Sequence, residues 1–571
     1  MSSGDRRRYL TATVLDQDFL DHCMDNLENK LELVVDIETP TGFIRASDRP
    51  KYVDGVFYDN RLVFPVINRT VGEWLSPELE FSTQRIELNN SDGEFDEFIP
   101  GGANYDGFIG KTVKVRLGLR DVASTYTTIF NGTISDVGGF ARTVRSIVIT
   151  ARDDYEALNV SFPNTTLNST NFTSIESEVA GTILPVIYGD WTVSGNPKSD
   201  NASVPTFITN GQASRGTPAI NVEVYISENV NFSFDQTAVY LKRDEKFILI
   251  SSSDILSIVD NRKFEIDQDS GNTTLFFEGS TINFVLEDGD EFFVKVKGKN
   301  IGATLQDNIV AQAEDILLTY GGLVAGDFDT NWGTFQLKLT PAASAIFNIK
   351  SRVWIQEPQS VIQFALSLLE QVRLEAFVDR NLKLKLTGQH LDEFVASPTF
   401  RVSNRDVIEG QFQPQQDVRN HFNRAQGVFN FLPDINENSL KTSIFRNTAA
   451  VTQMSKEIAK EITFPNLYVE TDVDNQIKEI LKISSSGYEH IVCELTWRAL
   501  LLDIGDFIKL DVKIGSTVFS DVPCSIREIG YDPTGIKIPV RLWSYQLVPF
   551  TGYAGVTGAV GGTSATIIEE T

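Results

Sequence analysis

"LTWRALLLDIGDFIKLDVKIG" occupies residues 495–515 and places a short turn, Asp503-Ile504-Gly505-Asp506, between two runs in which apolar and polar residues alternate. Alternation with a period of two indicates strands that bury one face. Glycine adopts backbone angles that other residues avoid, so the Gly505-Asp506 pair predicts a tight corner between two strands. The stretch therefore predicts antiparallel β-structure near the end of the chain.

Further strand patterns surround this corner. The run EHIVCELTW (489–497) precedes it, and FSDVPCSIREIGYDP (519–533) and KIPVRLWSYQL (537–547) follow the returning run FIKLDVKI. Short turns between such runs are typical of antiparallel strands. The order in this block is strand, glycine corner and three further strands.

The same order occurs earlier in the chain. The run GFIGKTVKVRLGL (107–119) has Gly110 directly before an alternating stretch. TIFNGTISDV (128–137) follows, with a predicted turn at Asn131-Gly132, and RSIVITARD (145–153) comes next. The match lies in the order of the runs rather than in residue identity. It indicates that one β module occurs twice, and small barrels suit such strands.

Length and charge bound the number of domains and the class of partner. A chain of 571 residues exceeds a single core, which stops growing near about 250–300 residues. The 77 acidic and 50 basic residues give a formal net charge of −27. DNA-binding surfaces need clustered Lys and Arg, so this balance argues against specific DNA binding. DNA could still pass nearby without adhering, or the excess acid serves solubility alone.

Cysteine usage and hydropathy indicate where the chain is made. Three cysteines, Cys23, Cys493 and Cys524, are too few for a disulfide framework and suggest synthesis in a reducing compartment. Asp16 and Asp18 interrupt the place where a signal peptide has its apolar run, so we expect no signal peptide. We also expect no membrane span, since no stretch approaches 18 uncharged apolar residues.

Apart from a short helix-like tail at the end of residues 145–159, the helical patterns lie in the second half. Residues 304–322 have apolar residues at helical spacing, with Thr304 as the expected N-cap and Gly321 as the stop signal. Residues 358–386 predict an amphipathic helix followed by a hairpin, and residues 451–462 predict another helix. The rest of the sequence has strand patterns, five of them between residues 221 and 298.

These patterns predict a mainly β, multidomain chain with some α (α+β). We expect an N-terminal segment (1–30), a first tube-like β-barrel module (31–160), and a polar linker with an extended segment (161–220). An inserted β domain (221–300), an α+β domain with the helix and hairpin (301–470), a second β-barrel module (471–548) and a low-complexity C-terminal tail (549–571) follow.

Several of these stretches resemble the tail hub proteins of tailed bacteriophages. The glycine corner with its returning I-x-x-I-x-x-D-P strand (526–533) resembles their C-terminal module, and IFNGTISDV (129–137) resembles their F-x-G-x-I strand. LPVIYGDW (184–191) is similar to a phrase of tail tip proteins, and residues 360–386 are similar to the helix and hairpin of the same proteins. The matches keep their order over residues 31–547.

The resemblance implies a structural hub at the distal end of a phage tail. In such hubs three chains form a ring, and two barrels per chain match the sixfold tail tube as a symmetry adaptor. The ring would line the DNA exit channel and hold it shut until the host is bound. The implied partners are the chain itself as a homotrimer, the tail tube or distal tail protein, tip or fibre proteins, and the tape measure protein. The implied location is the virion, after synthesis in the bacterial cytoplasm.

Gly110, Gly132, Gly505 and Asp506 are the candidate site residues, as structural corners that shape the turns of the modules. Two alternatives stay open. One is a receptor- or carbohydrate-binding β-protein of the tail tip, with recognition in the insertion near residues 221–298. The other is a hydrolase embedded in the β scaffold. Assembly with tail tube protein separates the hub from both, and activity on peptidoglycan identifies the hydrolase.

Catalytic and metal-binding motifs do not stand out. The four histidines (residues 22, 390, 421 and 490) form no H-x-H or H-E-x-x-H pattern, and no G-x-S-x-G or Walker-type loop occurs. The acidic loop DGEFDEF (92–98), with Asn89 and Asn90, has oxygen ligands for a hard cation, but a solvated loop is the simpler interpretation. A buried structural role is expected for Cys493. We expect no enzyme activity, no cofactor and no metal site.

Overall fold

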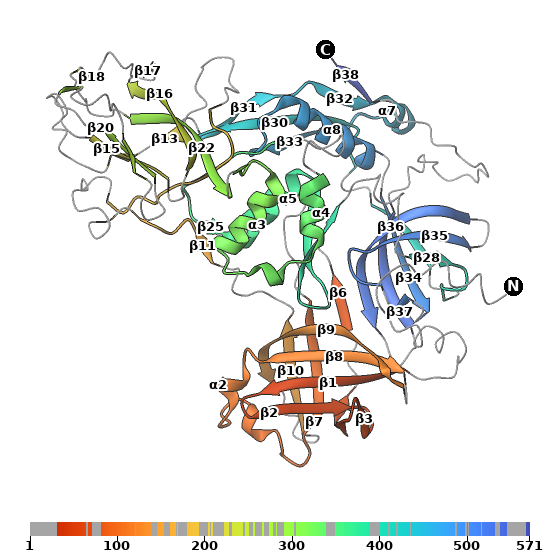
Figure 1. The fold of residues 1–571 in the computed structure, drawn as a ribbon. Helices are drawn as coiled ribbons and strands as arrows, with labels where there is room; N and C mark the ends of the chain where they lie inside the picture. Colours follow the sequence, from red (N-terminus) through yellow and green to blue (C-terminus); the bar gives the residue numbers. More distant parts are fainter. Residues whose placement is uncertain are drawn as a thin grey trace.

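In a computed structural model of the chain, the described residues are 31–63, 67–70, 82–119, 122–138, 145–152, 160–166, 168, 180–192, 204–205, 207–208, 222–227, 231–243, 246–249, 255–256, 265–267, 273–277, 281–282, 291–301, 304–338, 349–388, 400–408, 412–417, 421–433, 436–485, 488–496, 499–500, 502–514, 517–531, 537–544 and 567–570. Strands dominate these residues, and helices are few. The predicted class, mainly β with some α, is confirmed (Figure 1).

The first module is a nine-stranded sheet with the order β3-β4-β2-β1-β8-β9-β10-β7-β5. Val113, Val115 and Leu117 lie on its buried face, as the alternation in this run predicts. Its elements are β1 (Leu31–Thr39), β2 (Gly42–Ser47), β3 (Lys51–Val53), β4 (Val56–Asn60), β5 (Leu62–Val63), β7 (Thr83–Asn89), η2 (Asp96–Phe98), α2 (Tyr105–Phe108), β8 (Thr112–Leu119), β9 (Val122–Gly138) and β10 (Ser146–Arg152).

The second module is a sheet with the order β28-β35-β36-β37-β34-β29. Its strands are β28 (Phe400–Ser403), β29 (Gln413–Asp417), β34 (Tyr488–Thr496), β35 (Phe507–Ile514), β36 (Thr517–Tyr531) and β37 (Lys537–Ser544). The sequence β8-β9-β10-β7 in the first sheet is repeated as β35-β36-β37-β34 in the second. Both modules have the order that the sequence indicated: a strand, a glycine corner and three further strands. In both, the strand before the corner pairs with the last of the three strands after it.

Neither sheet closes into a barrel among the described residues, so the predicted barrels are corrected to open sheets. The two edges of the first sheet come close together at residues 56–63, where β4 pairs with β2 and the next strand in the chain, β5, pairs with β7. Between β4 and β5 the Arg61 N–H donates to the Ser47 carbonyl (3.1 Å), and the Asn89 N–H donates to the Arg61 carbonyl (2.8 Å). Arg61 takes part in both bonds, one to β2 and one to β7. Two bonds at one residue are not a continuous ladder of strand pairing, so they do not close the sheet into a barrel.

A strand from the first module completes the second. β6 (Ile67–Thr70) follows β5 in the chain and pairs antiparallel with the end of β36, with Arg69 opposite Ile529 and Asn68 opposite Gly530. Figure 1 shows β6 between the two sheets. Most buried apolar residues of both modules, together with Phe377, belong to one continuous cluster. The modules are therefore joined by backbone pairing and by a shared core.

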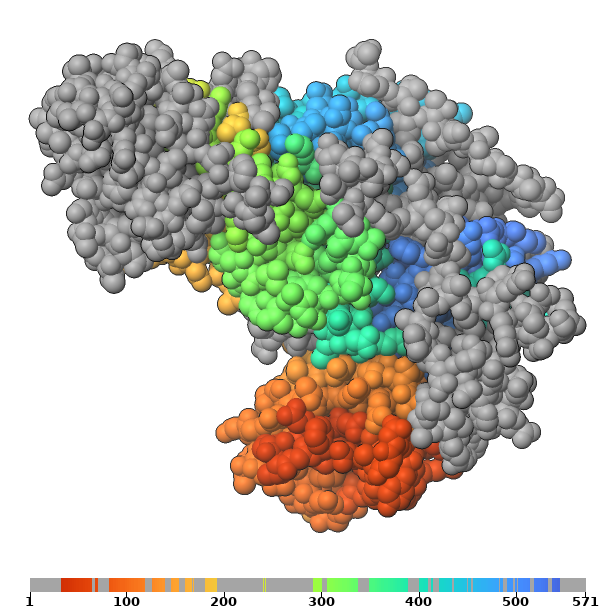
Figure 2. Space-filling model, in the orientation of Figure 1, coloured from red at the N-terminus to blue at the C-terminus, as the bar shows by residue number. Residues whose placement is uncertain are grey.

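The region between the modules holds the helices and the insertion. α3 (Ile309–Thr319) and α5 (Val361–Gln371) pack on each other, and α4 (Asn331–Lys338) packs on the hairpin of β26 (Leu374–Val378) and β27 (Leu384–Gly388). The remaining elements here are β11 (Ser161–Phe162), β12 (Val186–Tyr188), η5 (Ala325–Asp327), β24 (Val353–Ile355), β25 (Gln359–Ser360), β30 (Arg424–Leu432), β31 (Glu437–Lys441), β32 (Ile444–Asn447), α7 (Thr448–Met454), β33 (Ala459–Phe464), α8 (Glu470–Ser484) and β38 (Ile567–Glu570). Figure 2 shows the helical part abutting the first module.

Two helix predictions need correction. The helix expected over 304–322 begins at Ile309, because the Asn308 side chain accepts from the N–H groups of Val310 and Ala311 and caps it there. The helix expected over 451–462 covers only its start, where α7 ends at Met454, and β33 then pairs parallel with β30. Ser455, at the end of α7, has a left-handed backbone (φ 52°), which stops the helix.

The insertion contains the strands that its sequence predicts. β16 and β22 form a long antiparallel pair, and β15 pairs with β20. The strands in and next to the insertion are β13 (Val204–Pro205), β14 (Phe207–Ile208), β15 (Val222–Ser227), β16 (Asn231–Arg243), β17 (Lys246–Leu249), β18 (Ile255–Leu256), β19 (Glu265–Asp267), β20 (Thr273–Phe277), β21 (Thr281–Ile282), β22 (Glu291–Ile301) and β23 (Thr304–Leu305). The residues 1–30 and 549–566 lie outside the described part of the chain.

The motif LPVIYGDW (184–191) holds this central region together. The Tyr188 hydroxyl donates to Asp315 in α3 (2.6 Å), and the Trp191 indole N–H donates to the Tyr188 carbonyl (3.0 Å). The Arg352 guanidinium lies over the Trp191 ring at 4.3 Å. Burial lowers the pKa of Arg352 to about 10. Gly189 has φ 78°, and a Cβ added there would collide with the Ser351 carbonyl in the segment just before β24.

Candidate assembly site at the two glycine corners

The two predicted corners have the same backbone geometry. Gly110 has φ 80° and Gly505 has φ 74°, angles that favour glycine. The Gly110 N–H donates to the Ile134 carbonyl (2.8 Å), and the Ile134 N–H donates to the Lys111 carbonyl (2.9 Å). At the second corner the Gly505 N–H donates to the Ile526 carbonyl (2.8 Å), and the Ile526 N–H donates to the Asp506 carbonyl (3.0 Å). Ile134 of β9 and Ile526 of β36 therefore occupy equivalent positions.

A β-bulge follows each of these isoleucines. The β9–β10 register shifts between the pairs Ile134–Ala151 and Asp136–Thr150, so Ser135 is the extra residue. The β36–β37 register shifts in the same way between Ile526–Leu542 and Glu528–Arg541, which makes Arg527 the extra residue. Bulges re-aim side chains and tighten strand twist. The equivalence thus extends from the corner through the bulge in both modules.

The second corner is covered by the hairpin of β26 and β27. The Phe377 ring lies against Gly505 so closely that an added Cβ would collide with it. The Thr387 hydroxyl donates to the Gly505 carbonyl (3.2 Å). At the first corner, by contrast, nothing lies within 4 Å of the position that a Cβ on Gly110 would take. The two corners therefore have the same backbone conformation, but only the second is covered by the hairpin of β26 and β27.

Asp506 stabilises the second corner from within. Its carboxylate accepts from the Asp503 N–H (2.9 Å), which closes the turn over Ile504 and Gly505. Lys385 of β27 lies 3.6 Å from the same carboxylate as an ion pair. Burial raises the pKa of Asp506 above its ordinary value, and Lys385 opposes this effect. Asp506 thus lies within the corner, and its predicted role in shaping the turns of the module stays a prediction.

Buried ions connect this corner to β6 of the first module. The Arg69 guanidinium pairs with the Asp503 carboxylate and donates to the Val378 carbonyl. The Arg380 N–H also donates to Asp503 (3.2 Å). Burial alone would raise the pKa of Asp503, but Arg69 and Arg380 hold it below its ordinary value. A carboxylate shared by two arginines ties β6, the corner and the hairpin together.

The bulge residue of the second module makes another contact with the hairpin. Arg527 is buried, pairs through both terminal nitrogens with the Glu375 carboxylate of β26, and lies over the Trp543 ring at 3.9 Å. Ser135, its equivalent in the first module, is exposed and donates to the Thr150 carbonyl (3.2 Å). The sequence analysis missed Arg69, Asp503 and Arg527 as site residues, because their partners lie far away in the chain.

Gly132 does not form the turn predicted at Asn131-Gly132. It lies inside β9, a single 17-residue strand that continues through both residues. A Cβ at this position would collide with the Arg152 carbonyl of β10, so glycine permits a close approach of two strands. An Asn-Gly pair favours a turn locally, but hydrogen-bonded pairing with β8 and β10 on both sides of β9 holds this segment extended.

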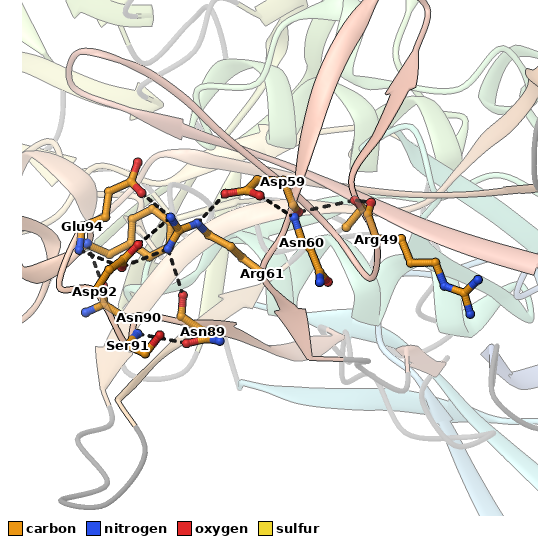
Figure 3. A network of polar contacts seen from close by, with 11 residues as sticks. Arg49, Asp59, Asn60, Arg61, Asn89, Asn90, Ser91, Asp92 and Glu94 are labelled. Carbon is orange, nitrogen blue, oxygen red and sulfur yellow. Dashed lines mark hydrogen bonds and ion pairs between the residues drawn. The ribbon is translucent and has the colours of Figure 1, made fainter.

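Asp92 and Glu94 of the acidic loop 92–98 point toward the Arg61 guanidinium, as Figure 3 shows. The Arg61 guanidinium donates to both carboxylate oxygens of Asp92 (3.0 and 2.7 Å), to Asp59 (2.8 Å) and to Glu94. Hydrogen bonding to Arg61 lowers the pKa of Asp92 to about 2. The Asn90 amide donates to Asp96 (2.8 Å). The oxygens that a cation could use are thus engaged with Arg61 and Asn90.

The cysteines and histidines of the described residues lie in the core or in structural contacts. Cys493 is buried and stands in β34 where Ile86 stands in β7, and burial raises its pKa to about 12. His490 accepts from the Trp543 indole N–H (2.8 Å), and burial lowers the pKa of His421. Cys23, His22 and His390 lie outside the described residues.

Two searches of the described residues gave nothing. No group of three or more His, Cys, Asp or Glu side chains there is arranged to hold a metal ion. No helix in the described ranges is long and apolar enough to cross a membrane.

Comparison with solved structures returns tail proteins. A tail protein from Neisseria meningitidis MC58 is 10% identical, with a TM-score of 0.41, and the match covers 90% of this chain and 96% of that chain. The 43 kDa tail protein of prophage MuSo2 from Shewanella oneidensis is also 10% identical, with a TM-score of 0.41 and coverage of 90% and 98%. A chain of a native gene transfer agent virion is 11% identical, with a TM-score of 0.37 and coverage of 66% and 88%.

No protein-family model matches the sequence, and no curated protein matches it. These structural neighbours are thus two tail proteins, one of them from a prophage, and a chain of a gene transfer agent virion, which is consistent with the class that the sequence motifs resemble. At these identities the likeness does not extend to activity or partners.

Proposed function

We propose that the chain is the structural hub at the distal end of a phage tail or a related tail-like particle. Three copies form a ring that adapts a sixfold tail tube to a threefold tip and lines the channel through which DNA leaves. The ring binds tail tube or distal tail protein on one side and tip or fibre proteins on the other, and the tape measure protein reaches it through the tube. It acts in the virion through conformational change.

The repeated module carries this proposal. The strand order, the glycine corner and the bulge recur in both modules. The first module gives β6 to the second, so different surfaces of like modules meet head to tail. Head-to-tail contacts generate rings when their rotation closes. Two like modules per chain provide six positions from three chains, which is the number that a sixfold tube requires.

The charge of the chain suits a channel for DNA. A net charge of −27 repels the phosphate backbone, so DNA would slide past the ring without adhering. The buried ions at the second corner also suit a hub, since they connect β6 of the first module to the corner of the second. No bond chemistry is part of this proposal.

The mass of the purified full-length chain, alone and with its tail tube protein, tests the proposal. Sedimentation velocity is expected to give a trimer, either directly or once the tube protein is added. A control with a tube protein from an unrelated phage should leave the mass unchanged. A chain that stays monomeric and ignores its own tube protein would contradict the hub and favour a receptor-binding protein whose recognition surface lies in the insertion.

A further inference from the structure

We propose that the edge of β9 at residues 135–138 binds an extended strand from a second copy of this chain. The strand would run antiparallel to β9 and extend the first sheet. This inference rests on the proposed ring and names the surface through which one copy would contact the next.

The equivalent edge of the second module is already filled by β6. Residues 528–531 of β36 pair with β6 on one side, while residues 528 and 529 pair with β37 on the other. β6 therefore takes the side from which β35 pairs earlier along β36. In the first module, β8 pairs with β9 only as far as Thr133, and the Lys111 and Gly110 backbone contacts with Ile134 end that ladder. Among the described residues no strand continues it along residues 135–138.

Matched glycines show that one edge is filled and the other open. Gly138 lies four residues beyond Ile134, as Gly530 lies four beyond Ile526. A Cβ on Gly530 would meet Asn68 Oδ1 of β6 at 2.6 Å and Pro539 Cγ at 2.8 Å. A Cβ on Gly138 would meet nothing within 4 Å. Among the described residues, none therefore lies beside Gly138 as Asn68 of β6 lies beside Gly530.

Exposure differs in the same direction at the neighbouring positions. Ser135 and Asp136 are exposed, whereas Arg527 is buried and Glu528 is half-buried. Val137 and Ile529 are both buried, so the core face of the two strands is the same and only the edge differs. A strand edge offers N–H and C=O groups that can pair with another chain, which is how strands add to sheets.

A second copy is the occupant that the geometry favours. At the edge of β36 the strand comes from a module of the same kind, and the contact is head to tail. Repeating that contact between chains would place the second module of one copy beside the first module of the next. The incoming strand would then see the same corner backbone that β6 sees, with Gly110 in place of Gly505.

Gly138→Val tests this edge without disturbing the isolated chain. Valine favours strands, and the vacant space accepts its side chain. The same side chain would crowd the side chain placed opposite it on an incoming strand, as a Cβ on Gly530 would collide with the Asn68 side chain of β6. We expect the self-association constant, measured by sedimentation equilibrium, to fall by about tenfold or more, which corresponds to about 1.4 kcal/mol. Gly42→Val is the matched control, because Gly42 also has nothing within 4 Å but lies on β2.

Amide hydrogen exchange gives an independent measurement on the unmodified chain. Residues 136–138 should exchange more slowly at assembling concentrations than at dilute ones. Residues 528–530 should be protected at both, because β6 pairs with them within each chain.

The outcomes separate this edge from the ring itself. Weaker association of Gly138→Val but not of Gly42→Val, with protection of residues 136–138 on assembly, supports the proposal. Assembly that Gly138→Val leaves unchanged, or that both variants weaken equally, overturns this edge while the ring stands. A wild-type chain that never associates, even with tube protein, overturns both the edge and the ring.

Discussion

The two glycine corners share a backbone and differ in their surroundings. Gly110 and Gly505 have nearly the same φ, and each donates a hydrogen bond to an isoleucine carbonyl in the second strand after the corner. Gly505 lies beneath Phe377 and beside a buried carboxylate held by two arginines, whereas the space around Gly110 is open. The comparison shows that local sequence sets the shape of the corner, while contacts between distant segments determine its energetic importance.

The bulge after each corner follows the same rule. Ser135 and Arg527 hold the same position in the ladder, yet only Arg527 reaches the hairpin of the central region. The second module is thereby fixed to its own chain, and the first keeps a corner and a strand edge available. This difference is the basis for each prediction below.

Asp503→Asn should have the largest effect. Removing the charge leaves Arg69 and Arg380 buried without their shared carboxylate, and breaking a buried ion pair costs about 3–5 kcal/mol of unfolding free energy. Urea unfolding measures the loss. Asp521→Asn is the control: its carboxylate pairs with Arg401 (2.7 Å) and Lys509 (3.0 Å) at the surface, and exposed pairs contribute about 0–1 kcal/mol. Equal losses in the two variants would contradict the structural role of Asp503.

Alanine substitutions at the two corners should separate the effect of the left-handed backbone from the effect of the Phe377 ring that covers Gly505. Gly110→Ala should lose about 1–2 kcal/mol of unfolding free energy, since it forces alanine into the left-handed region. Gly505→Ala should lose about 2–4 kcal/mol, because overpacking against the Phe377 ring adds to the same backbone strain. The double variant Gly505→Ala/Phe377→Leu should recover part of the loss. A Gly110→Ala variant as unstable as Gly505→Ala would break the comparison.

The two bulge residues should respond less strongly. Arg527→Ala removes a bidentate ion pair with Glu375 and should lower the unfolding free energy by about 2–3 kcal/mol. Ser135→Ala removes an exposed hydroxyl, and we expect a change within about 0.5 kcal/mol. Thermal unfolding of the two variants and the wild type provides the measurement. If Ser135→Ala proves the more harmful, the bulges do not differ as described.

Acid should weaken the second corner gradually. The pKa of Asp503 in the folded chain lies below its ordinary value of 3.8, so its stabilisation is complete above pH 3.8 and declines as the pH falls further. Asp506 has the opposite sign, because its raised pKa means that the charged carboxylate costs stability and that protonation at low pH relieves this cost. The stability gap between wild type and Asp503→Asn should therefore be constant near neutral pH and shrink below pH 3.8. A gap that shrinks only above neutral pH would rule out Asp503 as its source.

The sequence predicts the parts of the fold that depend on local patterns. Alternation located β8, β10 and β35, and the glycine before each corner located both turns. The doubled strand order was visible because the same sequence of runs occurs twice. Local rules failed where pairing overrode them: Asn131-Gly132 is extended inside β9, and the end of 451–462, from Ala459 on, pairs with β30 as a strand.

The site itself was only half predictable. Gly505 and Asp506 follow from the corner motif, but Arg69 lies in the stretch INRT, which has no signal of a buried ion pair. Its partner Asp503 is 434 positions away. The closing of a barrel also depends on pairing between distant strands, so the repeated module could be inferred while its open form could not.

β6 also places a constraint on synthesis. The strand is made early, yet its pairing partner, residues 528–531 of β36, leaves the ribosome about 450 residues later. At about 5–20 residues per second, roughly 20–90 seconds pass between the two events. The first module must fold during this interval with β6 and Arg69 unpaired, and the second module cannot finish until translation is nearly complete. A chain cut short anywhere before residue 528 would present that strand to whichever neighbour reached it first.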